Sequence, residues 1–355
     1  MLIKRLTAEK YDLKLREPFS YHTLTLDCLR YVLIRVTTDT GLVGIGEAAL
    51  AWDVTGETQG GALAAAEIIE PLVVGSRLLE VDDVRFLMMR IGASLAGNTG
   101  LKAAVESALF DVLGQAKRKP VFALLGGKKK LFVRLQKTFS FEEMGRVSDS
   151  VIKDIIKQGV KIFKFKVGDD KSAEVSILRV IGKLFPDISI VLDANQAWSS
   201  PAEAVTFLKA LSSLKIAWLE QPLPAQDYDG LARLRRQIRI PIMADESCHN
   251  LWHLKILKER HAIDLVNIKL SKCGGLLEAK RMIAYCREHG FKYMLGDMIH
   301  SDVGTAYNLH AACLGNFVSY DLTLPSRLDA SRASGLTWNG YTVAVPTVPG
   351  LGVTC

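Results

Sequence analysis

The sequence predicts an α/β protein, a (β/α)7β barrel of the TIM type with a smaller α+β capping domain. Eight short apolar runs, most ending in a polar or charged residue, recur about every 25 residues from residue 131 onward, which is the length of one strand–helix unit. The stretches between the runs are amphipathic and long enough to form crossover helices between parallel strands. The chain has 355 residues, more than the roughly 250 of a barrel alone, so a second domain is expected.

Residues 1–128 predict the capping domain. Residues 29–37 (LRYVLIRVT) are rich in β-branched and aromatic residues, a turn follows at residues 39–41, and LVGIGEA returns as a second strand. Helical spacing follows near residues 60–70, 80–91 and 100–118. The barrel is expected over residues 129–324. Residues 325–355 carry strand and turn signals, and we expect them to pack back on the capping domain.

Composition narrows the class of protein. Hydrophobic residues make up 49% and charged residues 23% of the chain, as in globular proteins. No apolar run is long enough for a membrane span or a secretory signal, so we expect a cytoplasmic protein without a membrane partner. The basic runs accompany no nucleic-acid motif, so the net charge of +7 is assigned to solvated surface and to small anionic substrates. The six cysteines lack metal-binding spacing and are expected to be reduced thiols.

Charged residues end five consecutive runs. Lys164 and Lys166 end the second run, and Lys269 ends the sixth. One acid ends each of the three runs between them: Asp193, Glu220 and Asp245. In a barrel these strand ends meet at one mouth, where polar residues are typically catalytic. Three carboxylates there would repel one another without a cation, and hard oxygen ligands favour Mg²⁺, so we expect one Mg²⁺ per subunit, with Mn²⁺ as a substitute.

The lysines flank this expected metal site from two sides. A carbon acid next to a carboxylate is very weak, so removing its proton requires a base together with a metal on the carboxylate oxygens. Lysine can be that base if neighbouring cations lower its pKa towards about 7–8. Bases on opposite faces allow a proton to leave from one face and return on the other, which inverts the carbon.

The motifs KFKVG, LDANQAW, EQPLP, ADES and NIKLSKCGG occur in this order, and with them the chain resembles the muconate-lactonising branch of the enolase superfamily, most closely its dipeptide epimerases. GLVGIGEA and LFDVLGQAKRKPVFALLGG resemble the capping domain of that family. The resemblance implies that Lys166 and Lys269 are the acid/base catalysts and that Lys164 polarises the substrate carboxylate. It also implies the three Mg²⁺ ligands Asp193, Glu220 and Asp245, and a substrate contact at Thr138. Tyr21 and His22, in the loop at residues 18–24, are further expected substrate contacts.

Two departures from the family pattern concern specificity. Dipeptide epimerases usually end the eighth strand with Asp-x-Asp, which holds the substrate ammonium, whereas this chain has Asp321, Leu322 and Thr323. Asp297, which ends the seventh run, is the expected replacement for the lost carboxylate. Residues 18–24 lack the arginine of epimerases for acidic dipeptides, which argues against an acidic second residue. His300, just beyond the seventh run, is retained only as a residue of the pocket.

We therefore expect a homo-oligomeric isomerase that acts on a small carboxylate. It would invert the α-carbon of a dipeptide or related amino carboxylate by two-lysine 1,1-proton transfer through an enolate. The alternative is an N-acylamino acid racemase or a muconate-type cycloisomerase on the same scaffold, favoured if Thr323 means that no ammonium is bound. A catalytically inactive barrel kept for binding is disfavoured, because no expected metal ligand or lysine is lost.

Overall fold

A computed structural model describes residues 1–21, 24–330 and 332–355. The N-terminal part is an antiparallel sheet in the order β1-β2-β3, made of β1 (Ile3–Tyr21), β2 (Leu24–Thr38) and β3 (Val43–Ala48). It is followed by α1 (Gln59–Val73), α2 (Val81–Ser94), α3 (Thr99–Lys117) and α4 (Val121–Leu124). The predicted strand pair and the three predicted helices are therefore present. The backbone of α3 lies so close to β3 that a Cβ on Gly46 would be 1.9 Å from the Ala104 carbonyl oxygen.

The second part is the predicted barrel. Its eight strands pair in parallel in the order β12-β11-β10-β9-β8-β7-β6-β5. The strands are β5 (Lys137–Phe139), β6 (Ile162–Lys166), β7 (Ser189–Asp193), β8 (Ile216–Glu220), β9 (Ile242–Ala244), β10 (Leu265–Ile268), β11 (Lys292–Gly296) and β12 (Tyr320–Asp321). The first and last strands approach each other, since the Gln136 amide donates to the Tyr320 carbonyl at 2.9 Å. The expected (β/α)7β fold is confirmed.

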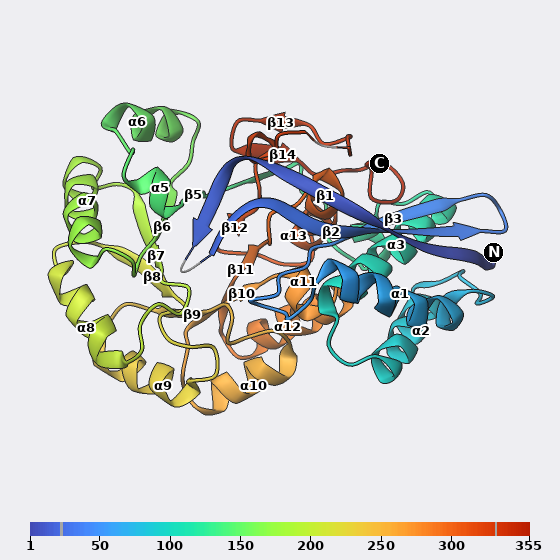
Figure 1. The fold of residues 1–355 in the computed structure, drawn as a ribbon, viewed down its shortest axis with the longest axis horizontal. Helices are drawn as coiled ribbons and strands as arrows, with labels where there is room; N and C mark the ends of the chain where they lie inside the picture. Colours follow the sequence, from blue (N-terminus) through green and yellow to red (C-terminus); the bar gives the residue numbers. More distant parts are fainter. Residues whose placement is uncertain (22–23, 331) are drawn as a thin grey trace.

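Helices in the seven crossovers surround the strands on the outside (Figure 1). They are α5 (Phe141–Met144), α6 (Asp149–Lys157), α7 (Lys171–Leu184), α8 (Pro201–Ala210), α9 (Tyr228–Gln237), α10 (Leu251–Glu259), α11 (Leu270–Cys273), α12 (Leu276–Glu288) and α13 (Asp302–Ala312). None of the helices in the described ranges is long and apolar enough to cross a bilayer.

The alternation of side chains along the strands places the acidic residues directly above an apolar cluster inside the barrel. Inside the barrel a buried cluster is formed by Val191, Trp218, Met243, Leu265 and Met294. Val191 pairs with Trp218, and two residues further along the same strands Asp193 pairs with Glu220. Because side chains two apart share a face of a strand, the acids project into the barrel at its C-terminal mouth. Polar side chains at this end, with an apolar core below, are the arrangement of a barrel active site.

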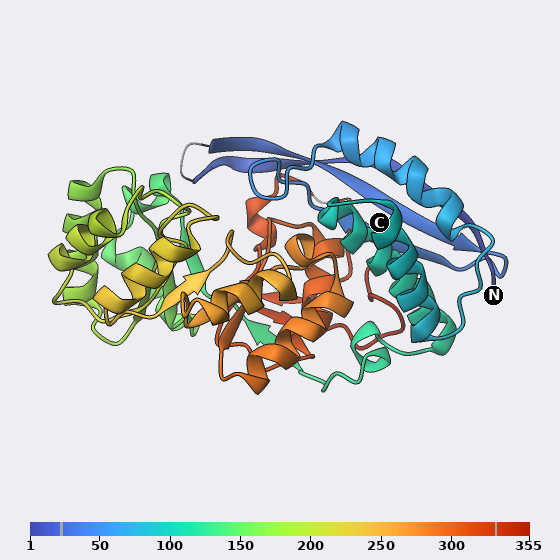
Figure 2. The same cartoon turned by 90° about the horizontal axis from the view of Figure 1, so that it is seen from below.

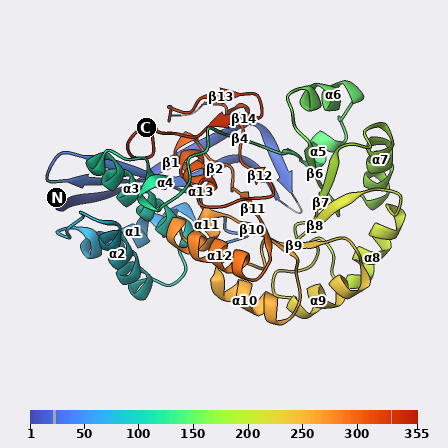
Figure 3. The same cartoon turned by 180° about the vertical axis from the view of Figure 1, so that it is seen from behind.

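The capping sheet reaches over this mouth. Strands β1 and β2 extend from the sheet across the barrel towards its mouth (Figures 1 and 2). From behind, the C-terminal segment lies beside the cap (Figure 3). It contains η1 (Pro325–Arg327), β13 (Trp338–Asn339) and β14 (Thr342–Ala344), and β14 pairs with β4 (Phe132–Arg134), so the first predicted run divides between β4 and β5. The Leu351 amide also donates to Asp111 of α3 at 2.9 Å. The exact domain limits stay a prediction.

Candidate active site

A pocket of about 380 Å³ lies between the barrel mouth and the β1–β2 hairpin. The predicted site residues that line it are Tyr21, Thr138, Lys164, Lys166, Asp245, Lys269, Asp297, Asp321 and Thr323. Asp193 and Glu220 are buried and contact the lysines of this lining directly. His22 lies outside the described residues. The structure thus gathers the predicted side chains that it describes around one pocket, while their roles stay predictions.

Lys164 is held among three carboxylates. It points into the barrel beside the Thr138 position of β5, and its ammonium nitrogen lies 3.1 Å from Asp193, 3.3 Å from Glu220 and 2.5 Å from Asp321. Burial lowers the pKa of Lys164, but the three carboxylates outweigh burial and raise it well above its usual value. Lys164 is therefore a fixed positive charge and not a base.

Lys166 and Lys269 enter the pocket from opposite sides of the acids. Lys166 ends β6 and Lys269 follows β10, and the three strands between them carry or precede the acids. The Lys166 nitrogen lies 2.8 Å from Asp193 and 2.5 Å from the Asn195 side-chain oxygen, while the Lys269 nitrogen lies 2.7 Å from Asp245. The Asn195 amide in turn donates to Glu246 at 3.0 Å. Each lysine is thus oriented by partners of its own.

Lys272 is a site residue that sequence reasoning missed. Its side chain is 1% exposed, and its nitrogen donates to the Asp245 carboxylate, to the Asp245 carbonyl at 2.5 Å and to the Asn267 carbonyl at 3.1 Å. It lies on the short helix α11, three residues after Lys269. Burial raises the pKa of Asp245, but Lys269 and Lys272 outweigh burial and lower it. Lys272 therefore fixes the orientation and charge of Asp245.

The three strand-end acids have the donor chemistry of a Mg²⁺ site. Burial raises the pKa of Glu220 to about 7, and the charges of Asp193 and Asp245 add to this rise, so the acids repel one another. Hard carboxylate oxygens that lack enough positive charge are the ligands that Mg²⁺ prefers. Within the described part of the chain, no group of three or more His, Cys, Asp or Glu side chains has the arrangement of a metal site, and lysine nitrogens contact these carboxylate oxygens. The residues fit the ion, and its binding stays a prediction.

The expected lowering of a lysine pKa by a second lysine and Mg²⁺ stays a prediction. Burial lowers the pKa of Lys269, but the charge of Asp245 outweighs burial and raises it above the usual value. Sequence spacing placed other cations beside the lysine, but it did not show that a carboxylate lies nearer. The 2.7 Å contact with Asp245 is the cause of this rise.

Comparison with known proteins places the chain in a family. The model of the mandelate racemase/muconate lactonizing enzyme N-terminal domain matches residues 5–126, and the enolase C-terminal domain-like model matches residues 148–355. The chain belongs to the enolase superfamily. It is 33% identical to L-Ala-D/L-Glu epimerase from Clostridium acetobutylicum, over 99% of both chains. It is also 30% identical to the hydrophobic dipeptide epimerase from Enterococcus faecalis, over 94% of each.

The solved structures agree with this placement in the enolase superfamily. The dipeptide epimerase from Cytophaga hutchinsonii, solved with Mg and the dipeptide D-Ala-L-Val, superposes with a TM-score of 0.92 at 30% identity, covering 100% of this chain and 96% of that one. The N-succinyl Arg/Lys racemase from Bacillus cereus also gives 0.92, at 26% identity, covering 100% and 95%. The resemblance to the muconate-lactonising branch is confirmed, and the protein is an isomerase of the racemase and epimerase type.

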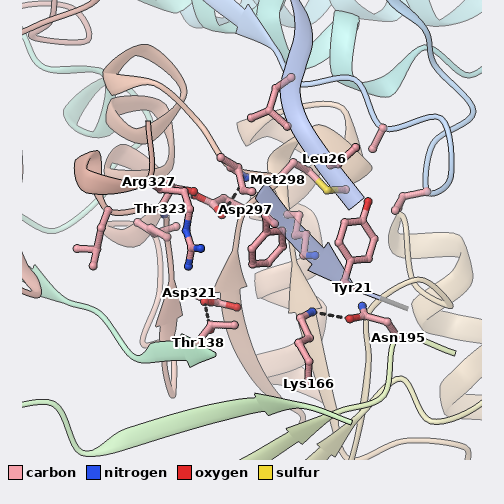
Figure 4. Close-up of a pocket in the computed structure, with 18 of the residues that line it drawn as sticks. Tyr21, Leu26, Thr138, Lys166, Asn195, Asp297, Met298, Asp321, Thr323 and Arg327 are labelled. Carbon is pink, nitrogen blue, oxygen red and sulfur yellow. Dashed lines mark hydrogen bonds between the residues drawn. The ribbon is translucent and has the colours of Figure 1, made fainter. Parts of the chain in front are cut away.

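In this enolase-superfamily isomerase, two acids line the side of the pocket near β11 and β12 (Figure 4). Asp321 accepts from the Thr138 hydroxyl at 2.6 Å, and Asp297 accepts from the amide and the hydroxyl of Thr323 at 2.7 and 2.9 Å. Burial raises the pKa of Asp297, and the charge of Asp321 raises it further. Thr323, which replaces the family's second acid, therefore hydrogen-bonds a carboxylate from the neighbouring strand end.

Three arginines line the outer wall of the pocket, although the sequence of the loop at residues 18–24 contains none. Arg16, Arg30 and Arg327 all line the pocket from outside that loop. The Arg327 guanidinium lies 4.9 Å from the Phe19 ring centre and 3.4 Å from Glu143, which Lys137 also contacts at 2.8 Å. Glu17 and Glu143 line the pocket together with these arginines. The prediction against an acidic second residue stays a prediction.

The hairpin supplies an aromatic contact at the catalytic end. The ring centre of Tyr21 is 5.8 Å from the Lys166 nitrogen, and the Tyr21 hydroxyl donates to Asp53 at 2.9 Å. Figure 4 shows Tyr21, Lys166 and Asn195 on the side of the pocket away from Asp321 and Thr323.

His300 does not line the pocket. It is buried, with its Nδ1 2.7 Å from Glu47 of β3, so its retention as a pocket residue was wrong.

Proposed function

We propose that this isomerase is a Mg²⁺-dependent dipeptide epimerase that inverts an α-carbon with two lysines. One observation carries the proposal: Lys166 and Lys269 enter one pocket from opposite sides of the three acid-bearing strand ends. A planar intermediate lying between them would have a proton donor or acceptor on each face. The relatives named as dipeptide epimerases support dipeptides as the substrate class.

The pocket binds a zwitterion at two ends. Lys164, with its raised pKa, attracts the carboxylate next to the reacting carbon, close to Asp193 and Glu220. At the neighbouring ends of β11 and β12, Asp297 and Asp321 attract the free ammonium at the other end of the substrate, and Asp321 also contacts Lys164 at 2.5 Å. Mg²⁺ bound at Asp193, Glu220 and Asp245 would stabilise the negative charge that develops on the substrate carboxylate.

Proton transfer then requires the two lysines in opposite states. The neutral lysine removes the α-proton from its face, and the protonated lysine returns a proton to the other face. Lys269 is held beside Asp245 at 2.7 Å on the other side of the pocket. Lys166 is held by Asn195 and Asp193, which aim its nitrogen into the pocket. The opposite stereoisomer uses the same two groups in reverse, as an epimerase requires.

An N-acylamino acid racemase is the second candidate. A specific observation favours it: Asp297 already accepts two hydrogen bonds from Thr323 and one from the Ile299 amide at 3.3 Å, so a neutral substrate end would also leave it satisfied. The structural likeness to the N-succinyl Arg/Lys racemase supports the same reading. The two candidates differ only in whether the substrate carries a free amine.

A substrate screen in deuterated water tests the proposal. Dipeptides and their N-acetyl and N-succinyl counterparts are incubated with the Mg²⁺-loaded enzyme, and mass gain is read by mass spectrometry. The proposal expects deuterium in free-amine dipeptides and much less in the acylated series. Preference for the acylated series would replace it by the racemase alternative. A Glu against Gln comparison at the second residue then reports whether the arginine-bearing wall selects an acid.

A further inference from the structure

A strained residue lies at the edge of the pocket. Ile299 has φ +65°, in the left-handed region where β-branched side chains are rare. It is the only β-branched residue among the described non-glycine residues with positive φ. Asp297, Met298 and Ile299 all line the pocket, directly after β11. Such a conformation persists only where surrounding contacts impose it, and strain of this kind gathers at functional sites.

Tyr31 of the capping sheet imposes part of this conformation. It is 2% exposed, and its hydroxyl lies 2.6 Å from the Met298 carbonyl oxygen and 3.0 Å from the Ile299 carbonyl oxygen. Two consecutive carbonyls can face one hydroxyl only if the chain turns sharply between them. Tyr31 therefore holds the backbone on both sides of the strained peptide.

Glu47, at the end of β3, holds the next two residues. Its carboxylate is fully buried, lies 2.7 Å from His300 Nδ1, and accepts from the Ser301 amide at 3.2 Å and from the Ser301 hydroxyl. The fit is close: a Cβ on Gly304 would lie 2.1 Å from the His300 ring and 2.9 Å from Glu47. One cap carboxylate thus fixes the loop that leads from β11 into α13.

The hydrogen bonds continue from this contact to the pocket. The His300 amide donates to the Thr323 hydroxyl at 3.3 Å, and the Thr323 hydroxyl donates to Asp297 at 2.9 Å. The Asp297–Thr323 contact lies at the pocket wall in Figure 4. A continuous chain of contacts therefore joins a cap residue, Glu47, to the carboxylate that faces the substrate.

We propose that Glu47 and Tyr31 are positioning residues: they hold residues 297–301 in the strained conformation that directs Asp297 into the pocket. The capping sheet thereby sets the affinity for the substrate amine through this loop; Glu47 is outside the pocket lining, while Tyr31 also lines the pocket. This inference rests on the proposed function only in assigning the amine to Asp297. The positioning itself is a property of the loop.

The first test compares two buried cap glutamates. Glu47→Gln should raise KM for free-amine dipeptides by about tenfold and leave kcat within about threefold, because binding changes while the lysines stay in place. Glu106→Gln is the matched control: Glu106 also joins cap to barrel, through Tyr307 and Leu277, but does not contact residues 297–301. An unchanged KM in folded Glu47→Gln, or an equal rise in Glu106→Gln, would overturn the proposal.

The second test uses the strain itself. Tyr31→Phe removes only the hydroxyl and should raise KM less than Glu47→Gln does. Adding Ile299→Asn should restore part of the lost affinity, because asparagine occupies the left-handed region more readily than isoleucine. The single Ile299→Asn variant completes the cycle. If Ile299→Asn lowers affinity equally in the parent and in Tyr31→Phe, strain control is excluded.

Hydrogen exchange separates this inference from the proposed function. In Glu47→Gln the amides of residues 297–301 should exchange faster than in the parent, whereas Glu106→Gln should leave them unchanged. This readout needs no substrate, so it stands even if no free-amine dipeptide is turned over. Unchanged exchange in Glu47→Gln would refute the positioning role while leaving the epimerase proposal intact.

Discussion

Glu106 of α3 is a buried acid whose charge opposes folding above neutral pH. Glu106 is 2% exposed, and its carboxylate accepts hydrogen bonds from the Tyr307 hydroxyl at 2.6 Å and from the Leu277 amide at 3.1 Å. Burial raises the pKa of Glu106 from 4.5 to about 7, and the hydrogen bonds offset only part of this rise. The perturbation that exposes the effect is Glu106→Gln, a neutral side chain of the same shape.

The direction in which stability changes with pH follows from the pKa of Glu106 in the folded protein and in the unfolded chain. Between about pH 4.5 and 7 the folded protein keeps the Glu106 proton while the unfolded chain loses it, so stability is fully present below pH 4.5 and falls as pH rises through 7. One pKa unit corresponds to about 1.4 kcal/mol, so the whole loss is about 3 kcal/mol, of which about 2.5 kcal/mol falls between pH 5 and 8. Glutamine has no such loss.

Urea denaturation at pH 5, 6, 7 and 8 measures the effect. The free energy of unfolding of Glu106→Gln, relative to the parent, should rise by about 2.5 kcal/mol from pH 5 to pH 8. Because the free energy of unfolding of the variant is compared with that of the parent at the same pH, the titration of all other groups cancels. A difference that stays constant over this range would show that Glu106 ionises normally and would refute the reasoning.

Three further outcomes follow from the site. Lys272→Met should lower the free energy of unfolding by about 3 kcal/mol, because it removes one of the two ammonium groups that contact the buried Asp245, whereas exposed Lys255→Met should change it little in the same urea experiment. Chelation of divalent ions, or Asp245→Asn, should lower turnover by orders of magnitude with an unchanged circular dichroism spectrum; full activity after chelation would contradict the metal assignment. Asp297→Asn should raise KM strongly for free-amine substrates, and Thr323→Asp should partly restore it; parent-like kinetics of Asp297→Asn would exclude its role.

The barrel and its mouth were predictable because they depend on local patterns. Parallel strands with crossover helices impose a regular spacing on the sequence, and side-chain alternation fixes which residues face inward. Asp193 and Glu220 fall at the ends of neighbouring strands for that reason, and the structure pairs them directly. Thr323 in place of an acid likewise led to the prediction that Asp297 lies nearby, and the structure places the two residues in contact.

The remaining site residues depend on contacts that no local pattern contains. Lys272 looks like a surface lysine in sequence, because only the packing of α11 against α3 and the contacts of its nitrogen with Asp245 and Asn267 show that it is buried. Arg327 reaches the pocket from a segment about 300 residues away from the loop at residues 18–24, where the pattern of epimerases for acidic dipeptides has its arginine. Glu47 meets His300 across the two parts of the chain, 253 residues apart. The raised pKa of Lys269 has the same origin, since it depends on the 2.7 Å distance to Asp245.

The central claim is that Lys166 and Lys269 act on opposite faces of one carbon. Lys166→Ala and Lys269→Ala are each incubated in deuterated water with the separate stereoisomers of a substrate identified in the screen, and deuterium at the α-carbon is followed. Both variants should lose epimerisation, and each should exchange only one isomer, with the two variants choosing opposite isomers. Exchange of both isomers by either variant, or of the same isomer by both, would contradict the two-base account.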